Sequence, residues 1–129
     1  MSMKNGSGVK QVIVVRGDLG LSAGELCGHV ANASHDWLTS KLDYDYHGDY
    51  ASVSGTILGS QLEWLDEGSP VEVVCTDTGH QLEELARQAR SHKLPTHLQY
   101  DVLRGIVCIA IGPESSEVIN TITGHLPML

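Results

Sequence analysis

Basic side chains are scarce in this chain of 129 residues, which has 8 Lys and Arg against 16 Asp and Glu and a formal net charge of −8. Proteins that bind a phosphate backbone usually carry a basic patch, so this balance argues against tight binding of nucleic acid. A local patch is still compatible with the sequence, because four bases lie close together along the chain: Arg87, Arg90, Lys93 and Arg104. A small substrate or a protein partner fits the overall charge equally well.

Cysteines and long apolar runs are also few. The three cysteines, Cys27, Cys75 and Cys108, lie in apolar segments and lack the Cys-x-x-Cys spacing of a metal site. We therefore expect free, buried thiols in a reducing compartment, the cytoplasm. No apolar run is long enough to cross a bilayer, so we expect no membrane contact. Residues 1–8 are polar, rich in Gly and Ser and without the apolar stretch of a signal peptide, and we expect a disordered tail there.

The residues that are present predict one α/β domain over residues 9–129, since 41% of the chain is hydrophobic and one core can form. Residues 9–16 are rich in Val and Ile with little alternation, which is typical of a strand buried on both faces. Three further strands are predicted at residues 71–76, 96–101 and 105–111. Helices are predicted at residues 22–40, 51–65, 78–91 and 115–123, and a polar, acidic, Tyr-rich loop at residues 41–50. Ser22 and Glu25 have the spacing of a capping box at the first helix.

This order of elements predicts the architecture. Strands that alternate with helices indicate a mostly parallel sheet covered on both faces. The last two strands follow each other directly, so they are expected to pair antiparallel. We therefore predict a three-layer α/β/α sandwich around a mixed four-stranded sheet, with residues 105–111 at its centre and residues 96–101 at an edge.

Four segments carry a resemblance to a known family. They read Val-Ile-Val-Val-Arg-Gly-Asp-Leu-Gly-Leu-Ser-Ala-Gly at residues 12–24, Leu-Pro-Thr-His-Leu-Gln-Tyr-Asp at 94–101, Ile-Ala-Ile-Gly-Pro at 109–113 and Ile-Asn-Thr-Ile-Thr-Gly-His-Leu at 119–126. In order and spacing they resemble the type 2 peptidyl-tRNA hydrolases. These enzymes hydrolyse the ester between a peptide and its tRNA without a metal. The resemblance covers the chain from residue 9 onward and implies the same fold, a homodimer and a cytoplasmic location.

The chain departs from the family pattern where the chemistry is assigned. The family's Lys, Gln and His on the first helix correspond to Glu25, His29 and Asn32 here, whereas Asp101 matches the family's Asp. The Thr-Gln and longer loop that follow that Asp are replaced by residues 102–105. A carboxylate in place of a lysine puts negative charge where tRNA phosphates approach. In these features the chain resembles a divergent, peptidyl-tRNA hydrolase domain-containing branch of the family.

Two hypotheses follow. In the first, the chain hydrolyses peptidyl-tRNA or a related acyl ester, with Glu25, His29 and Asp101 as the catalytic group, because residues four apart share a helix face and can combine for acid–base work. The resemblance implies substrate contacts at four further residues: Asp18, Ser22, Asn32 and Arg104. In the second, the chain is a catalytically silent relative that binds a small ligand or a protein partner. Glu25 would then only cap the helix and His29 would be a surface residue.

Other candidate sites are weaker. His29, His35, Asp36 and His47 match no standard metal spacing, and we expect neither a metal nor a cofactor. Residues 43–54 begin like a calcium loop but have Ser54 at the twelfth position, where a Glu is required, so a solvated acidic loop is expected. Free amides where the first helix begins could bind an anion. The two tryptophans, at positions 37 and 64, are expected to pack in the core.

Overall fold

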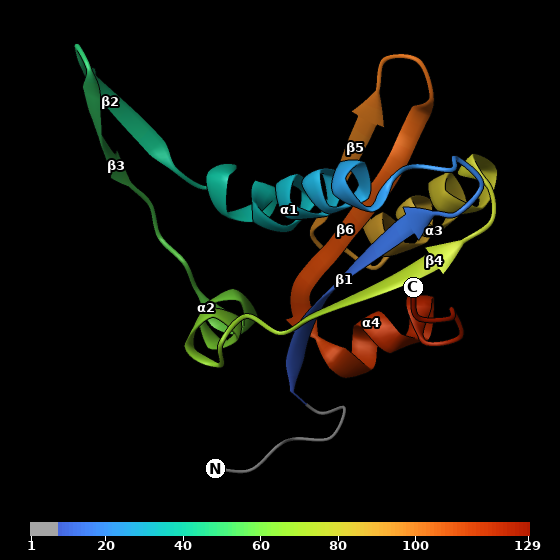
Figure 1. The fold of residues 1–129 in the computed structure, drawn as a ribbon. Helices are drawn as coiled ribbons and strands as arrows, with labels where there is room; N and C mark the ends of the chain where they lie inside the picture. The colour runs from blue at the N-terminus through green and yellow to red at the C-terminus, as the bar shows by residue number, and fades with distance from the viewer. Residues whose placement is uncertain (1–7) are drawn as a thin grey trace.

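The computed structural model describes residues 8–129, in which ten elements follow one another (Figure 1). They are β1 (Val9–Arg16), α1 (Ala23–Thr39), β2 (Asp43–His47), β3 (Tyr50–Ser54), α2 (Gly59–Asp66), β4 (Val71–Thr76), α3 (Gly79–Ser91), β5 (Thr96–Asp101), β6 (Gly105–Ser115) and α4 (Ser116–Thr123). None of the helices in this part of the chain is long and apolar enough to cross a membrane. The tail expected at residues 1–8 falls outside the described residues except for Gly8, whose carbonyl accepts a hydrogen bond from the Ser116 N–H.

The main sheet has four strands in the order β4-β1-β6-β5, which confirms the predicted mixed sheet with β6 inside and β5 at an edge. The expectation of a mostly parallel sheet is wrong, because only β1 and β4 pair parallel, while β6 runs antiparallel to both β1 and β5. The reason is the short turn at residues 102–104. It returns the chain beside β5, so β6 meets β1 from the opposite direction.

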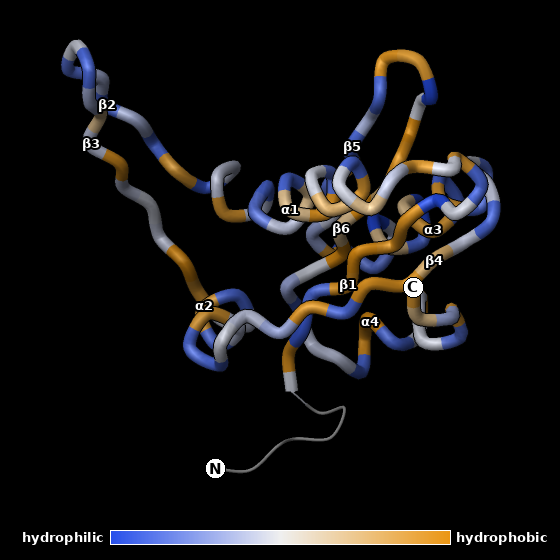
Figure 2. The backbone as a smooth tube through the Cα atoms, in the orientation of Figure 1, coloured by the Kyte–Doolittle hydropathy of each residue, from blue (hydrophilic) through white to orange (hydrophobic). Residues whose placement is uncertain are grey.

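Helices cover both faces of this sheet, as predicted. One face packs against α3 and α4 through a cluster that includes Val12, Val14, Leu82 and Ile119. The other face packs against α1 through Ile13, Val15, Ala33, Cys108 and Ala110. β1 and β6 are hydrophobic along most of their length (Figure 2), because each contributes side chains to both cores. The strands therefore form a rigid base under the first turn of α1.

The tryptophans form a third cluster beneath α1 and α2. Trp37 and Trp64 are both buried, as expected, and their rings meet edge to face with centroids 5.7 Å apart. Val9 of β1 packs with them. Above this cluster, buried Gln11 ties β1 to α1, because its amide donates to the Ser34 carbonyl at 2.9 Å and accepts from the Ser34 hydroxyl at 2.6 Å. These contacts hold α1 at a defined position on the sheet.

The segment between α1 and α2 differs from the prediction. Residues 41–50 are not a loop, and the helix expected at residues 51–65 begins only at Gly59; β2 and β3 instead form a separate two-stranded hairpin. Alternation of Tyr and Asp over residues 43–46 is a strand pattern. Gly48 has φ +73° and opens a two-residue turn, the place where glycine is favoured in hairpin turns. The acidic composition hid this alternation.

The cysteines are free, as expected, but not all are buried. Cys108 is buried, Cys75 is half-buried and Cys27 is exposed on α1, which corrects the expectation for Cys27. The apolar pattern around Cys27 belongs to Leu26 and Val30, which face the sheet, whereas Cys27 points away from it. Burial, with the Asp36 charge adding to it, raises the pKa of the Cys108 thiol to about 12. Cys108 is therefore a protonated core residue.

Candidate active site

The first turn of α1 lies at the carboxyl end of β1 and is closed by the predicted capping box. The Glu25 N–H donates to the Ser22 hydroxyl at 3.1 Å, and the Ser22 N–H donates to Glu25 Oε1 at 3.2 Å. These hydrogen bonds to Ser22 are the main reason that the pKa of the exposed Glu25 lies below its ordinary value. The carboxylate is therefore charged at neutral pH, and its Oε2 atom remains for another partner.

That partner is Arg104, which the turn between β5 and β6 brings to α1. Arg104 Nη1 lies 3.5 Å from Glu25 Oε2 and 3.3 Å from Asp101 Oδ2. One guanidinium thus lies between two carboxylates that are far apart in sequence. The structure thus brings Glu25 and Asp101, two of the three predicted catalytic residues, to the same guanidinium of Arg104, a predicted substrate contact.

Asp101 is held by the backbone of the same turn. Its Oδ1 accepts the Leu103 N–H at 2.8 Å and the Arg104 N–H at 3.2 Å. The Leu103 hydrogen bond is the largest cause of a pKa below the ordinary range, and Arg104 and His29 lower it further by their charge. Asp101 is therefore an anion at neutral pH, suited to orienting a donor rather than to giving up a proton.

His29 completes the group. It lies one turn after Glu25 on α1 and is half-buried, and its charge helps to lower the pKa of Asp101. Its backbone carbonyl accepts a weak hydrogen bond from the Cys108 thiol at 3.8 Å. This backbone contact holds the middle of α1 over β6.

Two other predicted residues lie differently. Asp18 is paired with Arg16, with Nε 2.7 Å from Oδ1 and Nη2 3.3 Å from Oδ2. Arg16 Nη1 also donates to the carbonyls of Arg104 and Ile106, so Asp18 is connected to the group through Arg16. Asn32 is exposed further along α1, and none of the hydrogen bonds described for residues 8–129 joins it to the group.

Sequence reasoning missed Arg16 and a polar row on β5. His97, Gln99 and Asp101 alternate along the strand and face α1, where the Gln99 amide donates to Asp36 Oδ2 at 2.8 Å. Within residues 8–129, His97 Nδ1 is a buried atom without a hydrogen-bond partner. The period-two pattern of residues 96–101 was the available signal.

The family model of peptidyl-tRNA hydrolase PTH2 matches residues 9–129. The chain belongs to this family. A relative named peptidyl-tRNA hydrolase from Methanopyrus kandleri is 39% identical over 126 residues, covering 93% of this chain and 97% of the relative. One of the same name from Methanocaldococcus jannaschii is 32% identical over 127 residues, covering 94% and 100%.

The cation beside Glu25 comes from a distant part of the chain. Arg104, in the turn between β5 and β6, places its guanidinium Nη1 atom 3.5 Å from Glu25 Oε2. The group formed by Glu25, Asp101 and Arg104 therefore contains two carboxylates and one cation.

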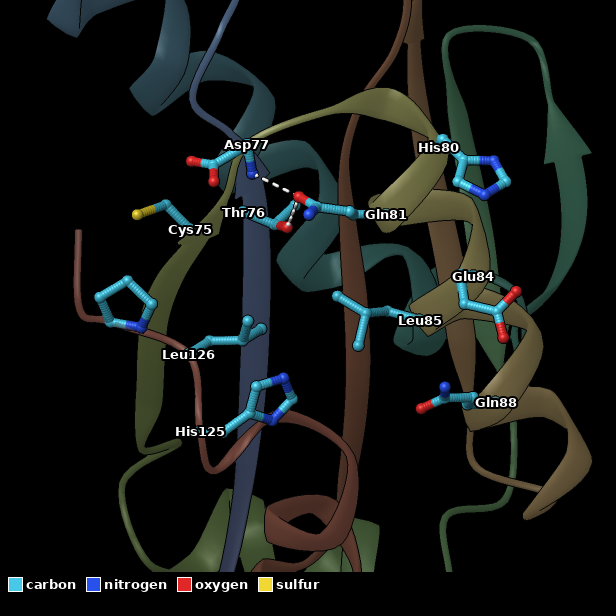
Figure 3. A pocket seen from close by; sticks show the side chains of 11 residues that line it. Cys75, Thr76, Asp77, His80, Gln81, Glu84, Leu85, Gln88, His125 and Leu126 are labelled. Atoms are coloured by element: carbon cyan, nitrogen blue, oxygen red, sulfur yellow. Dashed lines mark hydrogen bonds between the residues drawn. The ribbon is translucent and has the colours of Figure 1, made fainter.

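A cavity of about 510 Å³ lies elsewhere, on the α3 face of the sheet (Figure 3). Its walls are the end of β4, the first turns of α3 and the segment from His125 to Pro127. Gln81 crosses one side, where its Oε1 accepts from the Thr76 hydroxyl and the Asp77 N–H (dashed in Figure 3). The predicted catalytic residues do not line this cavity. Among residues 8–129 no three His, Cys, Asp or Glu side chains are grouped to hold a metal ion.

The partly buried imidazole of His97 predicts a pH dependence of stability. Burial lowers the pKa of His97 from 6.5, Asp36 opposes this shift and Arg90 adds to it. Because the unfolded chain binds the proton more readily, the contribution of this residue is present above about pH 6.5 and is lost as the pH falls through the lower folded value. We expect the urea midpoint to fall less between pH 7 and pH 5 in His97→Gln than in the wild type. An equal fall in both proteins, with the exposed His125→Gln as control, would contradict this assignment.

Proposed function

We propose that this chain hydrolyses the ester bond of peptidyl-tRNA or of a related acyl ester at the group formed by Glu25, His29, Asp101 and Arg104. The observation that carries the proposal is the Arg104 guanidinium, 3.5 Å from Glu25 and 3.3 Å from Asp101. An imidazole beside fixed carboxylates and a cation is an arrangement that can activate water and stabilise an oxyanion.

In the proposed mechanism, His29 accepts a proton from a water molecule as the water oxygen attacks the ester carbonyl carbon. Arg104 stabilises the negative charge that develops on the carbonyl oxygen. When the carbon–oxygen bond to the ribose breaks, the protonated imidazole returns its proton to the leaving oxygen. Asp101 remains ionised and orients the imidazole, in agreement with the direction of its pKa. Glu25 holds Arg104 in position from the other side.

The remaining predicted contacts surround this centre. Ser22 and Asp18 lie at the start of α1 and at the end of β1, and Asn32 is exposed further along the same helix. Val102 and Leu103, at the tip of the β5–β6 turn, are almost fully exposed and offer apolar surface to a substrate beside Arg104. These residues are proposed as substrate contacts rather than as catalytic residues.

A second candidate function is that of a catalytically silent relative that binds a small ligand or a protein partner. The favouring observation is that Arg104 is already engaged by two carboxylates, which leaves it less free to receive a substrate anion. The net charge of −8 also favours this second candidate, because it weakens attraction to tRNA.

The experiment that separates the two candidates is release of a labelled N-acetylated amino acid from its tRNA by the purified protein. A non-hydrolysable analogue, in which an amide replaces the ester, serves as the substrate control. Turnover of the ester but not of the amide supports the hydrolase. A folded protein, judged by circular dichroism, that releases nothing above the rate in buffer would rule out the first candidate and favour the second.

The charge of Glu25 predicts an effect on tRNA affinity. We expect Glu25→Lys to bind tRNA more tightly than the wild type, and the difference to grow at low salt, because a repulsive charge becomes an attractive one. The matched control is Glu117→Lys, the same charge change on exposed α4. Filter binding at several salt concentrations measures both. Equal tightening in the two variants would mean that net charge alone is responsible and that Glu25 has no special position.

Two further expectations go with the proposed function. One is a cytoplasmic location, which three free cysteines support because reduced thiols persist in a reducing compartment. The other is a homodimer, as the resemblance implies. Sedimentation velocity gives the oligomeric state, and fractionation of cells gives the compartment.

A further inference from the structure

The β2–β3 hairpin, residues 43–54, stands away from the rest of the molecule. Figure 1 shows that the hairpin projects from the domain and is joined to it only by the chain segments that lead to α1 and to α2. Apart from half-buried Ala51, every residue in its two strands is exposed. We call residues 43–54 the arm. The arm is well formed as a ribbon, yet neither of its faces packs on the sheet that forms the core of the domain.

The register of the arm sorts its side chains onto two different faces. Tyr44 pairs with Val53 and Tyr46 with Ala51, so one face is aromatic and apolar. The other face carries Asp43 opposite Ser54, Asp45 opposite Ser52 and His47 opposite Tyr50. The first set is the aromatic face and the second the acidic face of the arm.

The aromatic face is ordered but exposed. Tyr44 and Tyr46 stack with ring centroids 5.9 Å apart and an interplanar angle of 15°, and their exposed fractions are 46% and 75%. Val53 beside them is also exposed. Large apolar side chains gathered on one exposed surface are characteristic of a binding site.

Physical chemistry also argues against the arm being complete as it stands. A two-stranded hairpin is at best marginally stable in water, and it gains stability from a third strand or from packing on another element. Both outer edges of the arm present unpaired backbone N–H and C=O groups, which are templates for an additional strand. An added strand from a partner would therefore give the arm the stability that two strands alone do not have.

We propose that the arm is a docking surface for an extended segment of a partner protein whose residues alternate between apolar and basic. Such a segment adds to the edge of β2, whose own residues alternate Asp43, Tyr44, Asp45 and Tyr46. Alternate side chains of an added strand fall on opposite faces. Its apolar residues therefore cover the aromatic face, and its Lys or Arg residues meet the acidic face.

Charge selects this occupant over the alternatives. Residues 43–54 contain three aspartates, Asp43, Asp45 and Asp49, and no Lys or Arg. A second copy of this chain would bring the same charges to the contact, and directly opposed like charges destabilise strand pairs. A nucleic-acid phosphate is repelled for the same reason. A basic strand gains ion pairs with the aspartates, and its cations lie on the same face as the ring of Tyr50.

This inference is independent of the proposed hydrolase function, since the arm contains none of the residues assigned to the reaction. Hydrolysis can fail while the arm binds its strand, and the reverse is equally possible. The two proposals are therefore tested by separate measurements on the full chain, one of ester release and one of peptide binding.

The test uses a fluorescein-labelled eight-residue peptide of alternating valine and lysine, with fluorescence anisotropy as the readout. We expect saturable binding that weakens about tenfold or more when salt is raised from 50 to 500 mM, because the aspartates attract the lysines. Two control peptides are a block of four valines followed by four lysines, and an alternating valine–glutamate sequence. Binding of the block peptide as tight as that of the alternating one would overturn the strand geometry.

Variants of the arm locate the contact. We expect Tyr46→Ser and Asp45→Asn each to weaken peptide binding by about fivefold, the size expected for loss of one apolar contact or one ion pair in a partly dry site. The matched controls are Tyr100→Ser on β5 and Asp66→Asn at the end of α2, which make the same changes at exposed positions outside the arm. These controls should bind like the wild type.

A chain in which a short Gly-Ser linker replaces residues 43–54 gives the decisive comparison. It should keep the melting temperature of the domain and lose the peptide. Equal peptide binding with and without the arm, or no saturable binding to the wild type, would refute the proposal. Self-association of the wild type that disappears with the arm would instead assign the arm to a second copy and also overturn it.

Discussion

Replacing His29 by alanine is expected to lower kcat/KM for ester release from peptidyl-tRNA by about a hundredfold or more, the usual contribution of a general base. His29 lies one turn from Glu25 on α1, and in the proposed mechanism it both removes the proton of the attacking water and returns it to the leaving oxygen. Water alone cannot replace this function at neutral pH. The measurement is initial rate against substrate concentration, which separates kcat from KM.

The matched control is His35→Ala. His35 lies on the same helix and is exposed, and its ring contacts only the Ala31 carbonyl among the hydrogen bonds described for it. This variant should turn over like the wild type. A fall confined to KM in His29→Ala would make the residue a substrate contact, and unchanged turnover would remove it from the mechanism. Equal losses in both variants would point to a general effect on α1.

Replacing Trp37 by alanine is expected to lower the free energy of unfolding by about 3–5 kcal/mol, the range for removing a large buried aromatic side chain. Trp37 is 1% exposed, packs against Val9, and meets Trp64 edge to face with an interplanar angle of 82°. The substitution leaves a cavity at the point where β1, α1 and α2 join. Equilibrium unfolding in urea measures the change.

Two further variants interpret that result. Trp37→Phe should lower the free energy of unfolding much less, because most of the apolar volume remains. Tyr100→Ala, at an exposed position on β5, should change stability little. A loss below about 1 kcal/mol for Trp37→Ala would mean that neighbouring groups refill the space and that the tryptophan pair does not anchor α1. Because α1 carries Glu25 and His29, a loosened anchor should also reduce turnover at temperatures where the variant is still folded.

The secondary structure followed from the sequence where pattern and propensity agreed. The run of Val and Ile in β1, the apolar β6 and the Ser22–Glu25 capping box are confirmed, since each depends on neighbours in sequence. The arm was missed because its alternation is between Tyr and Asp rather than between apolar and polar residues. The prediction of a helix at residues 51–65 did not take account of the turn at Gly48. In the structure β3 occupies the first part of that range, and the helix α2 begins only at Gly59.

The candidate site, too, was predicted only in part from the sequence. Glu25 and His29 share a helix face by spacing alone, and Asp101 was placed beside them by the family resemblance. The central position of Arg104 could not be deduced, because it depends on a turn that folds a residue 79 positions away onto Glu25. The link from Asp18 to that turn through Arg16 is equally a product of strand order.

The sequence by itself determined the composition of the cores and the main strands, because hydrophobic periodicity and capping are local properties. The order and spacing of four segments carried the resemblance to the family. The tertiary structure alone decided which charges meet. It set a guanidinium between two carboxylates, left Cys27 in solvent and His97 partly buried, and turned an acidic loop into a two-faced arm. Electrostatic interactions act through space and depend on burial, so only the arrangement of the elements specifies them.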